Sequence, residues 1–385
     1  MATLAGFLVC LALTIYSGQR IFATIGPSRM MALPNGTLYL LSHGKLHIFA
    51  GDGKRVAAID LEALGVPQRP SDFEVHSDGR LVVTDPNRSV LHRCRLPSGP
   101  CEVLDVGLRS VPGQEVLPLN AAKIHIDEAA RRYYVSDNYG FRILIASFDG
   151  KLLGESKARV VRHPNQLAVT RAGELSVVDT DNQRIVTFDV TGDRVGRAIA
   201  QMSTDAGGVA RPGRLLPFDS VRFEDGATWV LVAARHMKDA DIVEFDARGV
   251  ARRRIALDED ADPFDIERWR GRVWVADATH YRFESVDRNG ARGTIEDRAF
   301  LDELAGERVA PQRWRIIRWA ARVGLVLVPL LGILALWKMG LVWPGGSAPA
   351  SLGRQPRTLV AIRVVLAIAT VIMAALIANF MLRLL

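Results

Sequence analysis

Cysteine is scarce in this chain, and the compact motifs of several enzyme classes are missing. Only 3 of the 385 residues are cysteine, too few for a small disulfide-rich module. The chain contains no G-x-S-x-G, H-E-x-x-H, Walker, G-x-G-x-x-G or C-x-x-C motif. Serine hydrolase, zincin, nucleotide-binding and dithiol redox functions therefore have no residues to support them. The 49% hydrophobic and 24% charged composition is that of a folded protein.

Acidic residues are missing from the last fifth of the chain. Residues 308–385 hold 10 of the 49 Lys and Arg residues and none of the 42 Asp and Glu residues. The net charge of +7 therefore divides into +10 for this segment and −3 for the rest of the chain. Because the basic excess lies outside the folded part, it does not describe a nucleic-acid-binding surface. We expect no nucleic-acid partner and a membrane association instead.

Long apolar runs in the same segment predict two membrane helices joined as a hairpin. They cover residues 323–342 and 358–383, and residues 343–357 between them are rich in Pro, Gly and Ser, as in an exposed loop. Residues 308–322 carry Trp and Arg on separate stripes, which predicts an amphipathic helix at the membrane interface. Small residues such as Gly332 favour close packing against an integral membrane protein partner.

The N-terminal segment, residues 1–19, is uncharged and contains an apolar run of the size found in signal sequences. It lacks a basic beginning and a clear cleavage site, so we interpret it as an uncleaved signal-anchor. A buried first strand of the folded domain is the alternative.

Cysteine placement bears on which side of the membrane the domain occupies. Cys94 and Cys101 flank the turn Pro-Ser-Gly-Pro, where a hairpin could join them in a disulfide, which favours an extracytoplasmic, periplasmic location. Reduced cysteines in a cytoplasmic hairpin would look the same. The arginines at Arg313, Arg315 and Arg318 lie on the domain side and favour the cytoplasmic alternative, which stays open.

Six repeated units fill residues 27–296, each with apolar strands separated by tight turns. The second strand of a unit follows a turn at Asn35-Gly36, Asp78-Gly79, Ala130-Arg131, Ala172-Gly173, Asp225-Gly226 or Arg270-Gly271. Four units then place an Asp at one register, namely Asp85, Asp137, Asp179 and Asp277. The pattern predicts an all-β, six-bladed β-propeller over residues 20–307, with the strand-like residues 20–26 completing the last blade.

Three of these units resemble NHL repeats. The segments are VSDNYGFRILIASFDGKLLG (135–154), VVDTDNQRIVTFDVTGDRVG (177–196) and VADATHYRFESVDRNG (275–290). The resemblance implies a six-bladed β-propeller and says little about activity, because that fold hosts enzymes, binders and scaffolds. We interpret the repeated pairs Asp137/Arg142, Asp179/Arg184 and Asp277/Arg282 as structural ion pairs or turn caps.

The mouth of the central channel is the predicted ligand-binding site. Polar residues recur there near the start of the innermost strand in five of the six units, as Asp72, Asn120, Asn165, Gln166, Asp219 and Asp265. Carboxylate and amide oxygens suit a hard cation such as Ca²⁺ or another divalent ion. The alternative is that each carboxylate caps the backbone of its own strand.

A distant similarity to gluconolactonase-like propellers implies a metal held by Asn165 and Asp219. The first blade departs from that family, because Arg29, Met30 and Met31 occupy the place of the expected Glu ligand. We therefore expect a non-catalytic protein-binding or assembly scaffold, anchored to the lipid bilayer and bound to a membrane protein. The alternative function is that of a metal-dependent, lactonase-like hydrolase.

Overall fold

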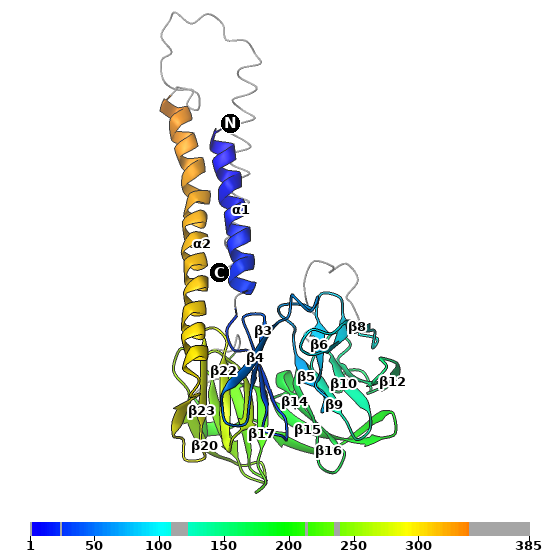
Figure 1. Ribbon diagram of the computed structural model, residues 1–385. Coiled ribbons are helices and arrows are strands. Elements are labelled where there is room, and N and C mark those ends of the chain that lie inside the picture. The colour runs from blue at the N-terminus through cyan, green and yellow to red at the C-terminus, as the bar shows by residue number, and fades with distance from the viewer. Residues whose placement is uncertain (1, 24, 109–121, 212–214, 235–238, 339–385) are drawn as a thin grey trace, which may run out of the picture. The chain divides into compact units, whose positions relative to one another are not determined.

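The structure is a computed structural model that describes residues 2–23, 25–108, 122–211, 215–234 and 239–338 (Figure 1). These residues divide between two compact units. Ala23–Arg308 form a β-propeller, and the other unit contains the N-terminal helix to Phe22 and the C-terminal helix from Val309. We describe each unit by itself.

The propeller consists of six antiparallel sheets, each made from four strands consecutive in sequence. This confirms the predicted all-β, six-bladed architecture. Blades 1 to 3 are β1 (Arg29–Ala32), β2 (Leu38–Ser42), β3 (Lys45–Phe49), β4 (Arg55–Asp60); β5 (Phe73–Val75), β6 (Arg80–Asp85), β7 (Val90–Arg95), β8 (Cys101–Leu104); and β9 (Ile124–Asp127), β10 (Arg132–Asp137), β11 (Arg142–Ser147), β12 (Leu152–Glu155). Blades 4 to 6 are β13 (Pro164–Val169), β14 (Leu175–Asp179), β15 (Arg184–Thr191), β16 (Arg194–Ser203); β17 (Leu216–Arg222), β18 (Thr228–Ala233), β19 (Asp241–Phe245), β20 (Ala251–Ala256); and β21 (Pro263–Trp269), β22 (Arg272–Asp277), β23 (Arg282–Val286), β24 (Arg292–Thr294). Two short 3₁₀ helices, Thr180–Asn182 and Gly207–Val209, lie between strands.

The predicted turns lie between the first and second strands of the blades. The second residue of each turn has a positive φ: Gly36 (86°), Gly79 (86°), Arg131 (54°), Gly173 (80°), Gly226 (84°) and Gly271 (72°). Glycine adopts this backbone conformation without a Cβ clash, which explains why it occupies five of the six positions. The four repeated Asp residues each end a second strand, as the sequence predicts.

Closure of the ring differs from the prediction. The expected contribution of residues 20–26 to the last blade is wrong, because all four strands of blade 6 come from residues 263–294. The ring closes where β1 lies beside β21, and the Gly26 N–H donates to the Ala278 carbonyl at 2.8 Å. A side chain at Gly26 would collide with that carbonyl, so glycine is required for this approach.

Apolar side chains fill the spaces between successive blades. Phe49, Phe188 and Phe245 are fully buried at the same position of the third strand in blades 1, 4 and 5. Because both faces of each blade are covered by its neighbours, the second strands are apolar almost throughout rather than alternating.

The two helices are α1 (Ala2–Ala23) and α2 (Arg298–Lys338). The alternative of a buried N-terminal strand is wrong, because residues 2–23 are helical. α2 runs continuously through Pro311 and Pro329, and so crosses residue 308, where the sequence predicts the boundary between the propeller and an interfacial helix. Within the propeller, the first turns of α2 insert Phe300 between Phe49 and Phe283, with ring centroids 5.1 and 6.1 Å away.

Inside the helical unit, α1 and α2 run antiparallel. Tyr16 meets Trp314 with ring centroids 5.4 Å apart, and Gly332 lies against Thr3. Gly332 therefore lies against α1 of its own chain, and its predicted packing against an integral membrane protein stays a prediction.

Across the described residues, no helix is both long and apolar enough to cross a membrane. The predicted transmembrane hairpin thus has no support in this part of the chain. The first predicted span, 323–342, extends beyond the described residues at its end, and the loop 343–357 and the second span, 358–383, lie wholly outside them.

Candidate functional site

The innermost strands of the six blades surround the central channel. They are β1, β5, β9, β13, β17 and β21, and each lies beside the innermost strand of the next blade. Side chains two residues apart on such a strand point to the same side, so each strand can present alternate residues toward its neighbour.

Three of the predicted site residues bridge neighbouring blades. The Asp72 carboxylate accepts a hydrogen bond from the Ile124 N–H, and Asp219 accepts one from the Ile266 N–H, both at 3.0 Å. Asp265 accepts from the Met30 N–H and so joins the last blade to the first. The channel-mouth carboxylates therefore satisfy backbone donors of the next blade.

The same bridge is repeated two residues further along the strand. Glu74 accepts from the Ile126 N–H at 2.6 Å, and Glu267 accepts from the Ala32 N–H. Among the predicted carboxylates, Asp219 also caps its own strand, because its second oxygen accepts from the Ser220 N–H at 2.7 Å. Glu267 does the same with the Arg268 N–H at 2.7 Å.

Blade 4 uses an amide for the same purpose. Gln166 donates to the Ser220 carbonyl at 2.8 Å and accepts from the Ser220 N–H at 3.1 Å. A β-bulge after Pro164, repeated after Pro217, aligns Gln166 with Asp219. Asn165 is one residue out of this register and donates to the Thr180 hydroxyl at 2.7 Å. Asn120 lies outside the described residues.

Arg29 lies among the bridging carboxylates. Its guanidinium is 3.4 Å from Asp265 and 3.7 Å from Asp72, and it donates to the carbonyls of Phe264 (3.1 Å) and Ser71 (3.4 Å). A second cation, Lys123, donates to the same Ser71 carbonyl at 3.1 Å. Two basic side chains thus offset the negative charge at this level of the channel.

Burial shifts the protonation of these groups. It raises the pKa of Asp72 to about 7 and that of Glu267 to about 8. Burial, followed by the nearby Asp265, raises the pKa of Asp219 well above its usual value. Burial alone would lower the pKa of Arg29, but Asp265, Asp72 and Asp219 raise it, so Arg29 is a permanent cation.

The residues at the mouth do not fit a divalent cation. A Ca²⁺ site needs several oxygen atoms free to converge on one point. Here the oxygens of Asp72, Asp219 and Asp265 accept from backbone N–H groups, and Arg29 lies beside two of them. No group of three or more His, Cys, Asp or Glu side chains suited to a metal is found within the part of the chain that the structure describes.

The repeated Asp/Arg pairs are structural in two blades and rearranged in a third. Arg142 bonds Asp137 at 2.9 Å and Arg184 bonds Asp179 at 2.7 Å, both with the Asp fully buried. Arg282 instead pairs with Asp258 at 2.6 Å. The third pair therefore does not form as predicted.

Four residues of the channel were not singled out as site residues from the sequence: Arg29 as a cation of the site, Lys123, Glu74 and Glu267. The spacing of the two glutamates holds a signal that could have found them. Glu74 lies two residues after Asp72, and Glu267 lies two residues after Asp265. No such spacing marks Arg29 or Lys123.

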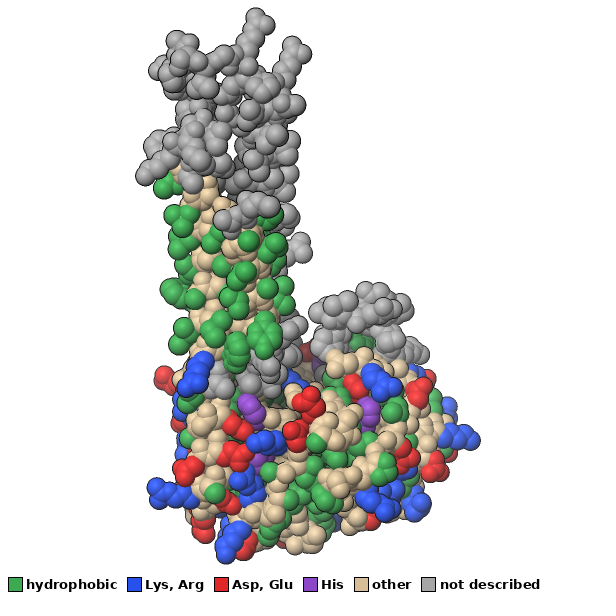
Figure 2. Space-filling model, turned by 45° about the horizontal axis from the view of Figure 1, so that its top comes forward, with side chains coloured by type: hydrophobic (Ala, Val, Ile, Leu, Met, Phe, Trp, Pro, Cys, Tyr) green, Lys and Arg blue, Asp and Glu red, His purple; other side chains and the backbone are tan. Residues whose placement is uncertain are grey.

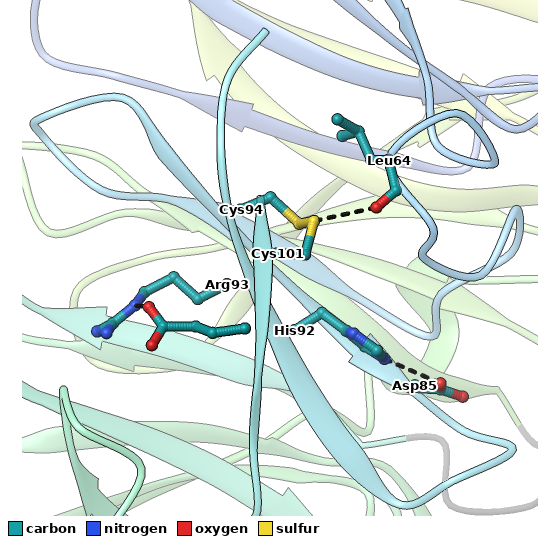
Figure 3. Close-up of a disulfide and its surroundings, with 7 residues drawn as sticks. Leu64, Asp85, His92, Arg93, Cys94 and Cys101 are labelled. Atoms are coloured by element: carbon teal, nitrogen blue, oxygen red, sulfur yellow. Dashed lines mark hydrogen bonds and ion pairs between the residues drawn. A yellow bond between two sulfur atoms is a disulfide. The ribbon is translucent and has the colours of Figure 1, made fainter. Parts of the chain in front are cut away.

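Cys94 and Cys101 form a disulfide across β7 and β8, with Cα atoms 4.1 Å apart (Figure 3). They are directly opposite each other in the register of the two strands. Nearby in the same blade, His92 and Asp85 form a buried pair at 3.0 Å. The disulfide closes the turn 95–100 on the rim of blade 2.

Together, the ring of blades and its channel mouth define a six-bladed β-propeller in which the channel-mouth carboxylates bind backbone N–H groups of the next blade, with Arg29 among them. Neither a protein-family model nor a curated protein sequence matches the chain. Among solved structures, it is similar to virginiamycin B lyase from Staphylococcus aureus, at 16% identity over 72% of this chain and 86% of that one, with a TM-score of 0.48.

Two further solved structures are similar to a comparable degree. A putative gluconolactonase is 14% identical over 66% of this chain and 86% of that one, with a TM-score of 0.47. A chain of a nidogen/laminin complex is 15% identical over 70% and 90%, with a TM-score of 0.45. At this level of similarity they bear on no activity of this chain.

Proposed function

We propose that this chain is a membrane-attached β-propeller that acts as a non-catalytic protein-binding or assembly module. The observation that carries the proposal is the position of Arg29. Its guanidinium lies beside Asp72 and Asp265, where a metal-dependent propeller enzyme would need a cation. The bridging carboxylates hold the blades together and leave a rigid ring whose outer faces can bind a partner.

Membrane attachment through residues 1–19 and 308–383 is supported by the surface of the helical unit. Figure 2 shows hydrophobic side chains gathered along this unit. Ile316 and Trp319 are 67% and 68% exposed, and Leu4 and Leu331 are also exposed. Large apolar side chains left in water at this density favour burial in lipid or against an integral membrane protein.

An extracytoplasmic location of the propeller is supported by the Cys94–Cys101 disulfide. Structural disulfides persist in oxidising compartments and are rare in the cytoplasm. Labelling of intact cells with a membrane-impermeant thiol reagent tests this location. We expect the partly exposed Cys101 to react only after an external reductant is added. Reaction without reductant, and only after the inner membrane is opened, would place the propeller in the cytoplasm.

The partner can be tested by isolating the full chain from its native membrane in a mild detergent. We expect a membrane protein to copurify at a fixed ratio. The variant Trp319→Asp should reduce that ratio, while the matched control Arg313→Asp on the same helix should leave it largely intact. Isolation of the wild-type chain alone, even after chemical crosslinking in the membrane, would contradict the proposal.

The alternative function is that of a lactonase-like hydrolase. One observation favours it: Asp72 and Glu267 have pKa values raised to about 7 and 8, near the range useful for acid–base catalysis. Hydrolysis of a set of aldonolactones by the purified full chain tests this alternative. Turnover that is lost in both Asn165→Ala and Asp219→Ala, with intact folding, would establish it and overturn the non-catalytic proposal.

A further inference from the structure

The sides of the propeller contain six equivalent positions, one between each blade and the next. At each, a residue of the third strand is opposite a residue of the fourth strand, and in blades 1 to 5 the pair lies near the next blade. We call these the interblade pairs: Ile48/Ala57, Arg93/Glu102, Ile145/Gly154, Thr187/Ala200, Glu244/Arg253 and Ser285/Gly293.

Two of the interblade pairs are closed by ion pairs that reach the next blade. Arg93 bonds Glu102 at 2.6 Å and donates to the Phe148 carbonyl of blade 3. Arg253 bonds Glu244 at 2.8 Å and donates to the Arg288 carbonyl of blade 6 at 2.7 Å.

Two other pairs are closed without such an ion pair. At Gly154, the backbone of the next blade comes so close that a Cβ would overlap with the Asp193 carbonyl. At Ser285/Gly293, the Arg272 side chain lies across the pair and donates to the Ser285 hydroxyl at 2.8 Å.

The remaining two pairs are open and form pockets on opposite sides of the ring. The pocket at Ile48/Ala57, between blades 1 and 2, has a volume of about 650 Å³, and that at Thr187/Ala200, between blades 4 and 5, about 230 Å³. Both contain alanine on the fourth strand, where blade 5 has Arg253. Only the larger pocket falls within the size range of ordinary small-molecule sites.

The pocket between blades 1 and 2 is lined by both apolar and charged residues. Ile48, Ala57 and Ile59 are among the apolar ones, and the charged ones are Asp78, Arg80 and Arg95, which we call the basic rim because they carry a net positive charge. Arg80 forms an ion pair with Asp78, in which Nε lies 2.8 Å from the carboxylate. Arg95 is exposed and makes no ion pair with any residue that the structure describes. One cation is therefore free to bind an anion from outside the chain.

The disulfide holds the basic rim in place. Arg95, Leu96 and Pro97 belong to the turn that Cys94 and Cys101 close. Restricting this turn reduces the entropy that a ligand would otherwise lose in ordering it.

We propose that the pocket between blades 1 and 2 binds a small apolar carboxylate, with its apolar body against Ile48, Ala57 and Ile59 and its carboxylate on Arg95. This site is independent of the channel and of the membrane attachment proposed above. Its specificity comes from two features: the small side chain of Ala57, where blade 5 has Arg253, and the charge of Arg95, which makes no ion pair within the described residues.

The probe for the test is 3-[4-(trifluoromethyl)phenyl]propanoate, followed by ¹⁹F NMR as it is titrated into the full chain in lipid nanodiscs. The corresponding alcohol has the same apolar body and no charge, so it measures how much the carboxylate contributes to binding. Empty nanodiscs give the background signal. We expect saturable binding of one carboxylate per chain and at least about tenfold weaker binding of the alcohol, the usual effect of losing one charged hydrogen bond.

Variants then locate the site. Arg95→Ala should weaken carboxylate binding about tenfold. Ala57→Arg should abolish carboxylate binding. The double variant Ile48→Glu/Ala57→Arg should abolish it too, and it copies the Glu244–Arg253 ion pair of blade 5. Because its arginine has a partner, this variant guards against misfolding. The matched control Ala200→Arg, at the equivalent position of blade 4, should leave binding unchanged.

The proposal is overturned by any of three results: no saturable binding to the wild-type chain, equal affinity for the alcohol, or undiminished binding in the folded double variant. Loss of binding in Ala200→Arg but not in Ala57→Arg would place the site between blades 4 and 5 and also overturn it. None of these results depends on whether a membrane partner is found.

Discussion

At the scale of single residues, the channel mouth is held together by side-chain carboxylates that act as backbone acceptors. Neighbouring inner strands cannot form a continuous ladder because they belong to separate blades. Asp72, Asp219 and Asp265 supply the missing acceptors, and Arg29 and Lys123 offset their charge. A buried donor without an acceptor is costly, which explains why acidic residues recur at this level.

Asp265 carries the bridge that closes the ring between the last blade and the first. Asp265→Ala would leave the Met30 N–H and Arg29 without this partner. We expect the free energy of unfolding to fall by about 3 kcal/mol, the usual cost of breaking a buried charged pair. Urea denaturation measures the change, with exposed Glu259→Ala as the control. A loss as small as that of the control would show that the bridge is not structural.

The raised pKa values predict the pH dependence of stability. Asp72 and Glu267 bind a proton more tightly in the folded chain, with pKa values of about 7 and 8. Their contribution to stability is therefore complete below the unfolded values near pH 4, and it is lost as the pH rises through about 7 to 8. We expect a lower urea midpoint at pH 8.5 than at pH 5.5. Asp72→Asn/Glu267→Gln should reduce this difference, and a midpoint that rises with pH in the wild-type chain would contradict the account.

At the scale of elements, the beginning of α2 is part of the propeller. Phe300 is buried among Phe49, Phe283 and His47, and Glu303 bonds Lys45 at 2.7 Å. The helix thus contacts blades 1 and 6, the two that close the ring.

Phe300→Ala would leave a cavity at this contact. We expect a loss of about 3 to 4 kcal/mol in the free energy of unfolding, as for other buried aromatic residues. Hydrogen exchange should become faster in the first turns of α2 and in β3, while the neighbouring exposed Asp302→Ala should change neither quantity. Unchanged exchange in Phe300→Ala would mean that α2 does not depend on this contact.

Local features of the elements could be predicted from sequence, and features that join blades could not. The turns at Gly36 and Gly79 and the register of Asp137 follow from neighbouring residues alone. The partner of Asp72 is more than 50 residues away in sequence, so its backbone donor could not be inferred. Asn165 and Gln166 are both predicted site residues, and the sequence does not show which of them bonds to the next blade. The structure shows that Gln166 does, and its partner Ser220 is 54 residues away in sequence.

At the scale of the whole molecule, charge and apolar surface are divided between the two units. The propeller pairs most of its buried charges internally, while the helical unit exposes apolar side chains such as Trp319. This division supports the proposed combination of a rigid binding domain and a membrane attachment.

The Cys94–Cys101 disulfide makes the stability of the propeller depend on whether its surroundings are oxidising or reducing. Cys94→Ala/Cys101→Ala should lower the free energy of unfolding by roughly 2 kcal/mol, because a short closed loop restricts the unfolded chain. Reductant should lower the stability of the wild-type chain and leave the double variant unaffected. Cys10→Ala is the control, since Cys10 is a free thiol. Insensitivity of the wild-type chain to reductant would show that the disulfide is absent in the isolated protein.

The central claim is that the Arg29 guanidinium occupies the place where a metal ion would bind, so that the channel mouth is structural rather than a metal site. Calorimetric titration of Ca²⁺ into the full chain, with Arg29→Met as the comparison, tests it most directly. We predict no saturable binding to the wild-type chain up to millimolar Ca²⁺. A 1:1 site in the wild-type chain that is lost in Asp219→Ala would contradict the account and establish the metal-dependent alternative.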